Sequence, residues 1–400
     1  MTEHANHTQD EVFMQRALTL ARESIGLASP NPQVGCVLTQ TPSGGGTPKV
    51  IGEGAHLYDN RDHAEIVALK QAAARGFSPR GATAYVTLEP CSHHGRTGPC
   101  ADALVAAGIS RCVIATQDPN PQVSGQGIQK LRAANIEVTV GVLEQPARDL
   151  NDAFAHFIQH RTPFVTLKAA LSVDGKLAPP PASRFPNQPH WLTGPDARYE
   201  VQVLRHASDA VLTGIGTVLA DDPQLTDRSN ILGPNNLPRR RPLLRVILDT
   251  HLRIPLTSQL VRSANDASGE QSDLLILCGS LASPSKAAAL GSLGVEVDQV
   301  PDHAGRLSLP AVLSTLAERD ILSVLLECGS HLNGAFLRQN LADKAVLFYA
   351  ETELGDQALP FAEGFPSPYL FERFLHRTNR TTFGPDACVT GYLHDPWPAV

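Results

Sequence analysis

The chain has only seven cysteines in 400 residues, and they are odd in number and scattered (Cys36, Cys91, Cys100, Cys112, Cys278, Cys328 and Cys388). This argues against a disulfide framework and predicts a reducing, cytoplasmic compartment. The N-terminal region does not combine basic residues with an apolar run, and no apolar run is long enough to span a bilayer, so we expect no membrane association. The formal net charge of −7 gives no reason to expect a nucleic-acid-binding surface.

The length of the chain predicts two domains, because 400 residues exceed what one hydrophobic core usually serves. Helical and strand patterns alternate in both halves, which indicates α/β sheets with parallel crossovers and helices on both faces. We expect the polar residues 1–9 to form a loose leader. A first α/β domain is predicted at 10–155 and a second at 161–400, with a boundary between about 146 and 162, where an amphipathic stretch ends in Arg161-Thr162-Pro163.

The pattern also places individual elements. In the first half we predict strands at 34–39, 50–53, 82–88, 111–116 and 137–142, and helices at 10–25, 64–75, 101–107 and 126–134. In the second half we predict strands at 164–171, 210–213, 244–249, 273–278, 295–300, 322–327 and 344–349, and helices at 196–207, 309–319 and 333–340. In this arrangement His63 and Glu65 open one helix, Cys91 follows a strand, and Cys100 opens another helix.

One histidine, one glutamate and two cysteines form a pattern suited to a zinc site: His63-Ala64-Glu65, followed by Cys91 and Cys100. Imidazole and thiolates are ligands that zinc prefers, and three protein ligands leave the fourth tetrahedral position open for water. Glu65 lies two residues beyond His63, where it could move protons to and from that water without ligating the metal. Helix N-termini beyond strand ends also favour thiolate over thiol.

Each of these residues has a simpler interpretation when taken alone: His63 as a surface or capping histidine, and the two cysteines as small buried hydrophobes. The joint pattern favours zinc, since H-x-E followed by P-C-x-x-C is the signature of zinc-dependent base deaminases. Here the cysteines are nine positions apart rather than three, so the loop between them is enlarged. His93 and His94 lie in this loop, and we expect them to contact substrate, because three ligands and a water already fill the metal site.

The enlarged loop at 87–100, Thr-Leu-Glu-Pro-Cys-Ser-His-His-Gly-Arg-Thr-Gly-Pro-Cys, closely resembles that of the bifunctional riboflavin-biosynthesis deaminase/reductase family, commonly called RibD. Segments 30–36 and 117–123 support this resemblance. It implies a cytidine-deaminase-like three-layer α/β/α domain in which Asn31 contacts a pyrimidine ring, while His93 and Arg96 meet a ribose phosphate. The implied reaction removes the C2 amino group hydrolytically from 2,5-diamino-6-ribosylamino-4(3H)-pyrimidinone 5′-phosphate, a small-molecule pyrimidine nucleotide.

The second half carries weaker patterns of its own. Glycines at 213–217 follow a predicted strand without completing a dinucleotide-binding motif, and residues 327–330 precede a helix whose N-terminus could hold a pyrophosphate. Three blocks, at 167–176, 211–228 and 325–335, resemble the reductase domain of the same family. The resemblance implies a dihydrofolate-reductase-like α/β domain, NADPH as its cofactor, and hydride transfer to C1′ of the ring-opened ribosyl group.

The resemblance also implies a role for individual residues of the second half. Lys168 and Asp221 would be the catalytic ionisable groups near the reacting carbon. The residues implied to line NADPH are Ala170, Trp191, Thr217, Asp221, Gly329, Ser330, His331, Leu332, Asn333, Gly334 and Ala335. The residues implied to face the substrate are Arg205, Leu225, Arg228 and Glu327. Segment 177–190 departs from the family pattern, because it has five prolines and no glycine.

Three alternatives stay open. The first is a zinc deaminase of free nucleosides or tRNA with an unrelated second domain, although the P-C-x-x-C spacing and a basic surface are missing. The second is a reductase half that binds without catalysing. The third is a zinc-stabilised structural module, whose fourth ligand would have to be His93, His94 or Cys36. We also expect a homo-oligomer, a dimer or larger, as is common among small cytoplasmic enzymes.

Overall fold

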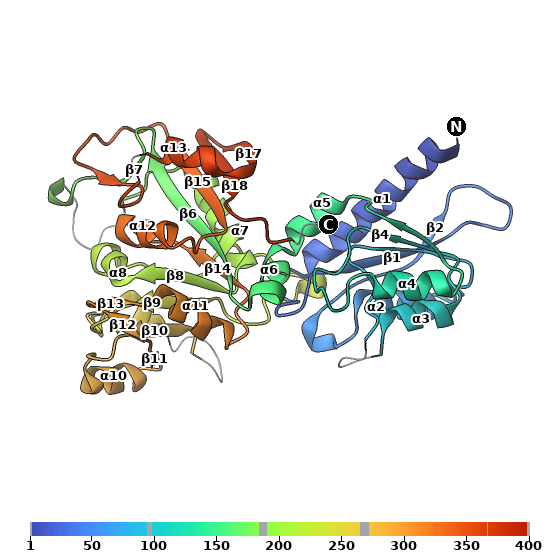
Figure 1. The fold of residues 1–400 in the computed structure, drawn as a ribbon, viewed down its shortest axis with the longest axis horizontal. Helices are drawn as coiled ribbons and strands as arrows, with labels where there is room; N and C mark the ends of the chain where they lie inside the picture. The colour runs from blue at the N-terminus through green and yellow to red at the C-terminus, as the bar shows by residue number, and fades with distance from the viewer. Residues whose placement is uncertain (1, 94–97, 184–189, 265–271, 366, 398–400) are drawn as a thin grey trace. The chain divides into compact units, whose positions relative to one another are not determined.

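The computed structural model describes residues 2–93, 98–183, 190–264, 272–365 and 367–397, and the chain folds into two compact units (Figure 1). The first unit takes in the chain up to His160, the segment Leu232–Arg240, and the C-terminal end from Trp397. The second unit takes in Arg161–Ile231 and Arg241–Pro396. No local sequence pattern anticipates that residues 232–240 return to the first unit.

The first unit contains a five-stranded sheet with the order β2-β1-β3-β4-β5. Strands β3, β4 and β5 are parallel, and β1 runs antiparallel to both β2 and β3. The strands are β1 (Gly35–Gln40), β2 (Lys49–Ala55), β3 (Thr83–Val86), β4 (Arg111–Ile114) and β5 (Glu137–Val140). The helices are α1 (Thr2–Glu23), α2 (Ala64–Ala74), α3 (Cys100–Ala107), α4 (Gln126–Ala133), α5 (Glu144–Leu150) and α6 (Asp152–His160), with a 3₁₀ turn η1 (Tyr58–Asn60).

Buried side chains of this sheet alternate between its two faces, as the period of two in a strand requires. In β1, Cys36 and Leu38 belong to a core cluster with α2, α3 and α4, whereas Val37 belongs to another cluster with α1 and α5. The sheet is therefore the middle layer of three, with helices over both faces (Figure 1). This confirms the predicted three-layer α/β/α fold of the first half.

Glycines let two helices approach the sheet at backbone distance. A Cβ added at Gly35 of β1 would lie 2.0 Å from the carbonyl oxygen of Ala17 in α1. A Cβ added at Gly52 of β2 would lie 2.2 Å from the carbonyl oxygen of Ala68 in α2. Because a side chain at either position would force its helix outward, Gly35 fixes how closely α1 packs on the sheet and Gly52 does the same for α2. The N-terminus of α2, where His63 lies, is fixed with it.

The second unit is built on a nine-stranded sheet with the order β11-β10-β9-β8-β14-β6-β15-β18-β17, parallel as far as β15 and antiparallel from there. Its strands are β6 (Phe164–Ser172), β8 (Ala210–Gly214), β9 (Leu244–Leu248), β10 (Leu274–Cys278), β11 (Glu296–Gln299), β14 (Ser323–Leu326), β15 (Lys344–Ala350), β17 (His376–Phe383) and β18 (Asp386–Tyr392). Two short pairs are β7 (Lys176–Ala178) with β16 (Leu359–Pro360), and β12 (Asp302–His303) with β13 (Arg306–Leu307). The helices are α7 (Pro195–Ala207), α8 (Ile215–Asp221), α9 (Gln259–Ser263), α10 (Pro284–Gly291), α11 (Leu309–Ala317), α12 (Ser330–Arg338) and α13 (Pro368–Phe371).

Helices cover both faces of this larger sheet as well. Helices α11 and α12 contribute Leu316 and Phe336 to a core cluster that also holds Leu212 of β8. The neighbouring strand residue Val211 points the other way, into a cluster with α8, α9 and α10. Helix α7 packs against β15 and β18 through a third cluster that includes Phe348. The predicted second α/β sheet with helices on both faces is confirmed.

Two details of local structure differ from the predictions. The expectation of a loose leader is wrong, because α1 begins at Thr2, and the stretch from there to Glu23 has no glycine or proline to end a helix. The hairpin β17–β18 is not anticipated by the pattern, since β17 is exposed at nearly every position and lacks apolar alternation. Among the described helices, none combines the length and the apolar character needed to cross a bilayer.

Candidate active sites

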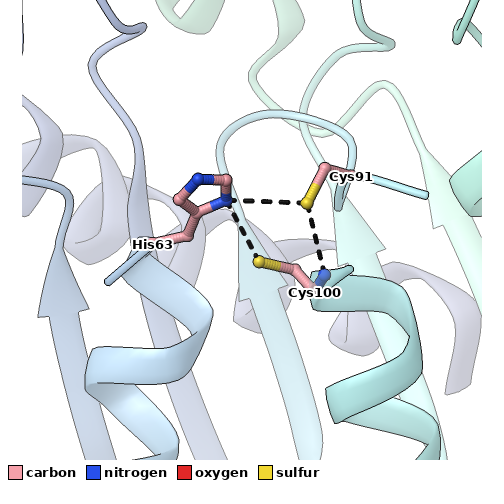
Figure 2. Close-up of side chains that lie close together, drawn as sticks. All are labelled: His63, Cys91 and Cys100. Carbon is pink, nitrogen blue, oxygen red and sulfur yellow. Dashed lines mark hydrogen bonds between the residues drawn. The ribbon is translucent and has the colours of Figure 1, made fainter. Parts of the chain in front are cut away.

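Three segments of the first unit bring His63, Cys91 and Cys100 together (Figure 2). His63 is the N-cap of α2, and Cys100 is the first residue of α3. Cys91 lies in the loop that follows β3, the central strand of the five-stranded sheet. All three residues thus lie at helix starts or beyond a strand end, as the sequence pattern predicts.

The geometry of this cluster fits a zinc ion. His63 Nδ1 lies 3.5 Å from Cys91 Sγ and 3.2 Å from Cys100 Sγ, and the three ligand atoms lie within 4.8 Å of one another. Ligand atoms of a tetrahedral zinc site are about 3.5 Å apart, given bonds of about 2.3 Å to sulfur and 2.0 Å to nitrogen. One imidazole nitrogen and two sulfurs are also the donor set that zinc prefers. These side chains therefore match zinc in both chemistry and spacing.

The charges around the cluster favour a thiolate. Hydrogen bonds from the side chain of Cys100, from His63 and from the backbone N–H of Cys100 together lower the pKa of Cys91 to about 4, against the effect of burial. That N–H, at the start of α3, donates to Cys91 Sγ over 3.2 Å. A helix N-terminus and an imidazole are two established causes of a depressed cysteine pKa. The Cys91 sulfur is therefore prepared to bind a cation.

Glu65 is buried in the first turn of α2, close to the cysteines. Burial raises its pKa to about 7, and the negative charge of Cys91 adds to this effect. A carboxyl group whose pKa lies near neutrality can both take up and return a proton at physiological pH. Its position and its pKa therefore suit the proton-transfer role that the sequence predicts.

Asn31 and His56 form a hydrogen-bonded pair beside His63. Asn31 Nδ2 lies 2.9 Å from His56 Nε2, and His56 Nδ1 lies 2.8 Å from the carbonyl oxygen of Asp62. Since a carbonyl only accepts, Nδ1 carries the proton and Nε2 accepts from Asn31. The His56 ring meets the edge of the His63 ring at 5.3 Å. Asn31 is thus held next to the cluster of His63, Cys91 and Cys100 through His56, a residue that no sequence motif indicated.

A further carboxylate, Asp118, also adjoins the cluster. Burial raises its pKa to about 6, and Glu89 and Cys91 act in the same direction, while His93 opposes them. The buried Glu89 orders the loop after β4 by accepting the backbone N–H groups of Asp118, Gly125, Gly127 and Ile128. Segment 117–123 supported the family resemblance in the sequence, but nothing local assigned Asp118 a place near Cys91.

The enlarged loop between the two cysteines is only partly described. His93 is exposed, which leaves it accessible to a ligand. Arg96, predicted to meet the substrate phosphate, and its neighbour His94 lie outside the described residues. Their proposed contacts therefore rest on the sequence.

The second unit contains a cavity of about 390 Å³. Strand β6 lines part of it, and so does Glu327, which directly follows β14. The described residues that line it include Lys168, predicted to be catalytic, and five residues predicted to bind cofactor or substrate, namely Ala170, Trp191, Arg205, Arg228 and Glu327. Lys168 and Ala170 are two residues apart in β6 and so lie on one face of the strand. Part of the divergent segment 177–190 also reaches the cavity, through Leu177 and His190.

A buried charge cluster forms one wall of this cavity. Glu327 takes a two-pronged contact from Arg205, at 2.6 Å from Nε and 3.1 Å from Nη2, and its carboxylate lies 3.8 Å from Lys168 Nζ. Burial acts to raise the pKa of Glu327, but Arg205 and Lys168 outweigh it, so this pKa is lowered. Burial lowers the pKa of Lys168, and Glu327 opposes that shift. The cluster therefore holds an ionised carboxylate between two cations.

The other predicted cofactor residues lie on two helices of the second unit, α8 and α12. Thr217 and Asp221 are in α8, and Gly329 is the N-cap of α12. The two helices approach each other, because a Cβ at Gly214 would lie 3.5 Å from Leu332. None of these residues is among the described residues that line the cavity.

Two members of the predicted cofactor block at 329–335 have packing roles. The side chain of Asn333 is fully buried, donates to the carbonyl of Phe361 and accepts from Cys328. A Cβ on Gly334 would lie 2.3 Å from the carbonyl oxygen of Glu363. Ser330 is buried at the start of α12, while His331 is exposed and pairs with Glu363. The block is thus anchored to segment 361–363.

Comparisons with known proteins identify both halves. Residues 7–116 match the cytidine and deoxycytidylate deaminase zinc-binding region, and residues 163–389, more than half of the chain, match the RibD C-terminal domain. The chain is 36% identical to the riboflavin biosynthesis protein RibD of Escherichia coli (strain K12) over 395 residues, 95% of this chain and 98% of that protein. The chain belongs to the RibD family.

Solved structures agree with this assignment. Acinetobacter baumannii RibD (form 1) is 35% identical, with a TM-score of 0.78 over 96% of this chain and 99% of that one. The diaminohydroxyphosphoribosylaminopyrimidine deaminase/5-amino-6-(5-phosphoribosylamino)uracil reductase of Thermotoga maritima is 33% identical, with a TM-score of 0.76 over 97% of this chain and 99% of that one. The dihydrofolate-reductase-like fold predicted for the second half is that of the RibD reductase domain.

Membership of the RibD family decides the class of function. The chain is a bifunctional deaminase/reductase of riboflavin biosynthesis, with a zinc-binding deaminase half and a reductase half that uses NADPH. A nucleoside or tRNA deaminase with an unrelated second domain is excluded, because the second half matches the RibD reductase domain. A purely structural zinc module is excluded with it.

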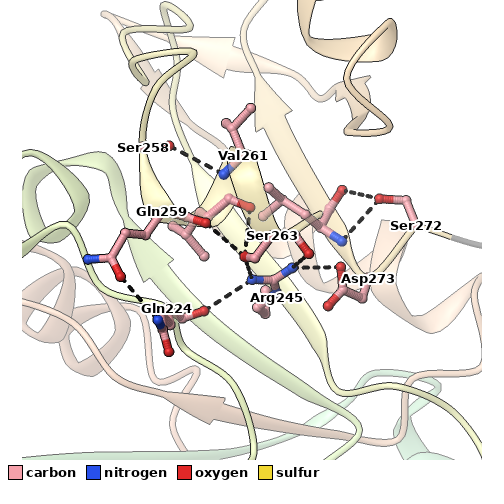
Figure 3. A network of polar contacts seen from close by, with 10 residues as sticks. Gln224, Arg245, Ser258, Gln259, Val261, Ser263, Ser272 and Asp273 are labelled. Atoms are coloured by element: carbon pink, nitrogen blue, oxygen red, sulfur yellow. Dashed lines mark hydrogen bonds and ion pairs between the residues drawn. The ribbon is translucent and has the colours of Figure 1, made fainter. Parts of the chain in front are cut away.

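In this RibD-family chain, a polar network around Arg245 holds segment 224–228 at Gln224 (Figure 3). The guanidinium of Arg245, only 1% exposed, donates to the carbonyl of Gln224 over 3.2 Å and to Asp273 over 2.6 Å. The side chain of Gln224 in turn accepts from Arg228 Nη1. Between them, Leu225 is buried and has a positive φ of 55°, an unfavourable conformation that the surrounding contacts maintain.

We predict that the purified full-length chain binds about one zinc ion per chain, and that Cys91→Ala loses it, because two ligands form a far weaker site than three. Cys36→Ala is the matched control, since this buried cysteine lies in β1 and is not one of the clustered ligands. Metal analysis after dialysis measures both. A wild-type content near zero, or equal zinc in Cys91→Ala and the wild type, would contradict the assignment.

Proposed function

We propose that the first unit removes the C2 amino group of 2,5-diamino-6-ribosylamino-4(3H)-pyrimidinone 5′-phosphate by hydrolysis. The observation that carries this proposal is the cluster of His63, Cys91 and Cys100 with the buried Glu65 beside it. The name of the Thermotoga maritima relative supports the substrate class, because it specifies a diaminohydroxyphosphoribosylaminopyrimidine deaminase. The first unit would thus act before the reductase.

In this proposal zinc would be held by His63, Cys91 and Cys100. When bound, it would lower the pKa of a water molecule and polarise the pyrimidine substrate. Glu65 takes a proton from the attacking water at its carboxylate and later delivers one to the leaving amine. Water adds at C2, the C2–N bond breaks, and ammonia leaves. A carboxyl pKa near 7 serves both transfers, because at neutral pH the carboxylate can take up a proton and the protonated carboxyl group can give it back.

Substrate contacts complete the deaminase proposal. Asn31 is held beside the metal ligands by His56, where its carboxamide can meet the edge of a pyrimidine ring. His93 on the enlarged loop, together with Arg96, would meet the 5′-phosphate, because a dianion needs donors and positive charge. Asp118 adds a carboxyl group near Cys91 that could accept from an amino group of the substrate.

For the second unit, we propose transfer of a hydride from NADPH to C1′ of the ring-opened ribosyl group. Lys168 Nζ lies near Glu327 at the cavity wall. It would give a proton to the substrate nitrogen bonded to C1′ when C1′ receives the hydride. Arg205, Leu225, Arg228 and Glu327 would face or shape the substrate site. Ala170, Trp191, Thr217, Asp221 and the block at 329–335 would line NADPH, with Asp221 also near the reacting carbon. Within that block, the N-terminus of α12 at Gly329 suits a pyrophosphate, because no described atom would crowd a Cβ there.

We further propose a cytoplasmic homo-oligomer, a dimer or larger. Seven free cysteines suit a reducing compartment. Strand β17 ends the nine-stranded sheet with exposed side chains, and an edge strand of this kind can pair with a second copy.

Glu65→Gln tests the deaminase proposal. We predict that this variant keeps its zinc but loses ammonia release by about 10²- to 10⁴-fold, because a carboxamide cannot shuttle a proton. Reduction of an already deaminated substrate by NADPH should be unaffected. Glu23→Gln, an exposed position at the end of α1, is the control. Ammonia release at the wild-type rate in Glu65→Gln would remove Glu65 from the mechanism.

Glu327→Gln tests the reductase proposal. We predict a loss of about 10- to 100-fold in kcat/KM for NADPH oxidation, because Arg205 loses a charged partner. Without the opposing carboxylate the pKa of Lys168 falls further. As pH is raised, the variant should therefore lose reductase activity at a lower pH than the wild type does.

Steady-state rates across pH, with ammonia release measured in parallel, report this change. Glu318→Gln, an exposed glutamate after α11, serves as the control. Equal losses of deaminase and reductase activity in Glu327→Gln would argue against separate sites, and an unchanged pH profile would argue against the Lys168–Glu327 contact.

A further inference from the structure

A segment from the second half of the sequence belongs to the first unit. Leu232–Arg240 lies in the chain between α8 and β9, both of the second unit, yet it packs with residues of the first. Gly233 marks how closely it packs, because a Cβ there would lie 2.3 Å from Leu27 Cδ1. The glycine therefore allows a contact that no other residue would permit without a shift.

Arg240, at the end of this segment, contacts two loops of the first unit at once. Its backbone N–H donates to the carbonyl of Gly26 over 2.9 Å, and its Nη1 donates to the carbonyl of Ser29 over 3.1 Å. Its Nε donates to Asp59 over 2.8 Å, and its guanidinium stacks 3.8 Å above the Tyr58 ring. One side chain thus ties the loop after α1 to the turn η1.

The two loops that Arg240 joins lead directly to Asn31 and His56. Asn31 lies two residues beyond Ser29, and His56 lies two residues before Tyr58. These two side chains hydrogen-bond to each other, and His56 contacts the ring of the metal ligand His63. Any change in the spacing of the loops would therefore change the Asn31–His56 contact.

The far end of the Asn31 loop is held separately. The buried Asn151 accepts from the backbone N–H of Gln33 over 2.8 Å and donates to its carbonyl over 3.0 Å. The loop is therefore fixed on one side by Asn151, which comes from the first half of the sequence, and on the other by Arg240, which comes from the second.

We propose that Arg240 is a positioning residue for deamination, which sets the Asn31–His56 pair at the metal cluster from the second half of the chain. This rests on the proposed deaminase function of that cluster. The exposed ion pair with Asp59, whose side chain is 73% accessible, contributes little on its own. The bond to the Ser29 carbonyl and the stacking on Tyr58 require the planar, forked guanidinium, which a lysine does not reproduce.

The test uses full-length Arg240→Ala, with ammonia release followed as a function of nucleotide concentration. Loss of a positioned substrate contact should raise the deaminase KM about tenfold and leave kcat within about twofold. Zinc content, the unfolding temperature and the NADPH-dependent reduction of deaminated substrate should match those of the wild type. Arg240→Lys should recover less than half of the lost affinity, since it keeps the charge without the fork. Arg132→Ala, an exposed arginine on α4, is the matched control.

A double-mutant cycle with Asn31→Ala separates this inference from the proposed function. If Arg240 acts through Asn31, Arg240→Ala should add little to the KM already raised by Asn31→Ala. An unchanged KM in Arg240→Ala, full recovery by Arg240→Lys, or a parallel fall of both activities with a lower unfolding temperature would each overturn the positioning role. An unchanged KM in Asn31→Ala itself would instead overturn the proposed substrate site.

Discussion

Two thiols and an imidazole from three chain segments can lie within 4.8 Å of one another only if the elements that carry them are held rigidly. The five-stranded sheet supplies that rigidity, because Cys91 follows β3, while α2 begins directly after His63 and α3 begins at Cys100. Close backbone packing of α2 on β2 at Gly52 fixes one of these helix starts. The fold of the first unit can thus be understood as a support for one cluster of side chains.

The second unit meets a different constraint, which is to keep charges buried at a cavity wall. Glu327 lies between Arg205 and Lys168, so the cost of burying each charge is offset by an opposite one. The buried Arg245 is paired in the same way with Asp273, and it donates to the carbonyl of Gln224, whose side chain accepts from Arg228. The two halves therefore separate two kinds of chemistry: metal-assisted proton transfer in one and hydride transfer beside paired charges in the other.

The sequence predicted those features of the fold and the site that depend on residues close together in the chain. The H-x-E and cysteine pattern located His63, Glu65 and Cys100 at helix starts and Cys91 beyond a strand end, and alternation of apolar residues located most strands. It did not find His56, whose place is set by hydrogen bonds to Asn31 and to the carbonyl of Asp62, or the packing of segment 232–240 on the first unit. These depend on contacts between residues far apart in the chain. Strand β17 was missed because nearly all of its side chains are exposed, so its sequence shows no alternation of apolar residues.

The most direct test of the central claim is a time course with the full-length chain and the diaminopyrimidine nucleotide, in which ammonia and NADPH are followed separately. Two sites acting in sequence predict ammonia release without NADPH present. When NADPH is then added, about one NADPH should be oxidised for each ammonia already released. Oxidation of NADPH with the diaminopyrimidine nucleotide before any ammonia appears, or no ammonia release at all from zinc-loaded protein, would contradict the account.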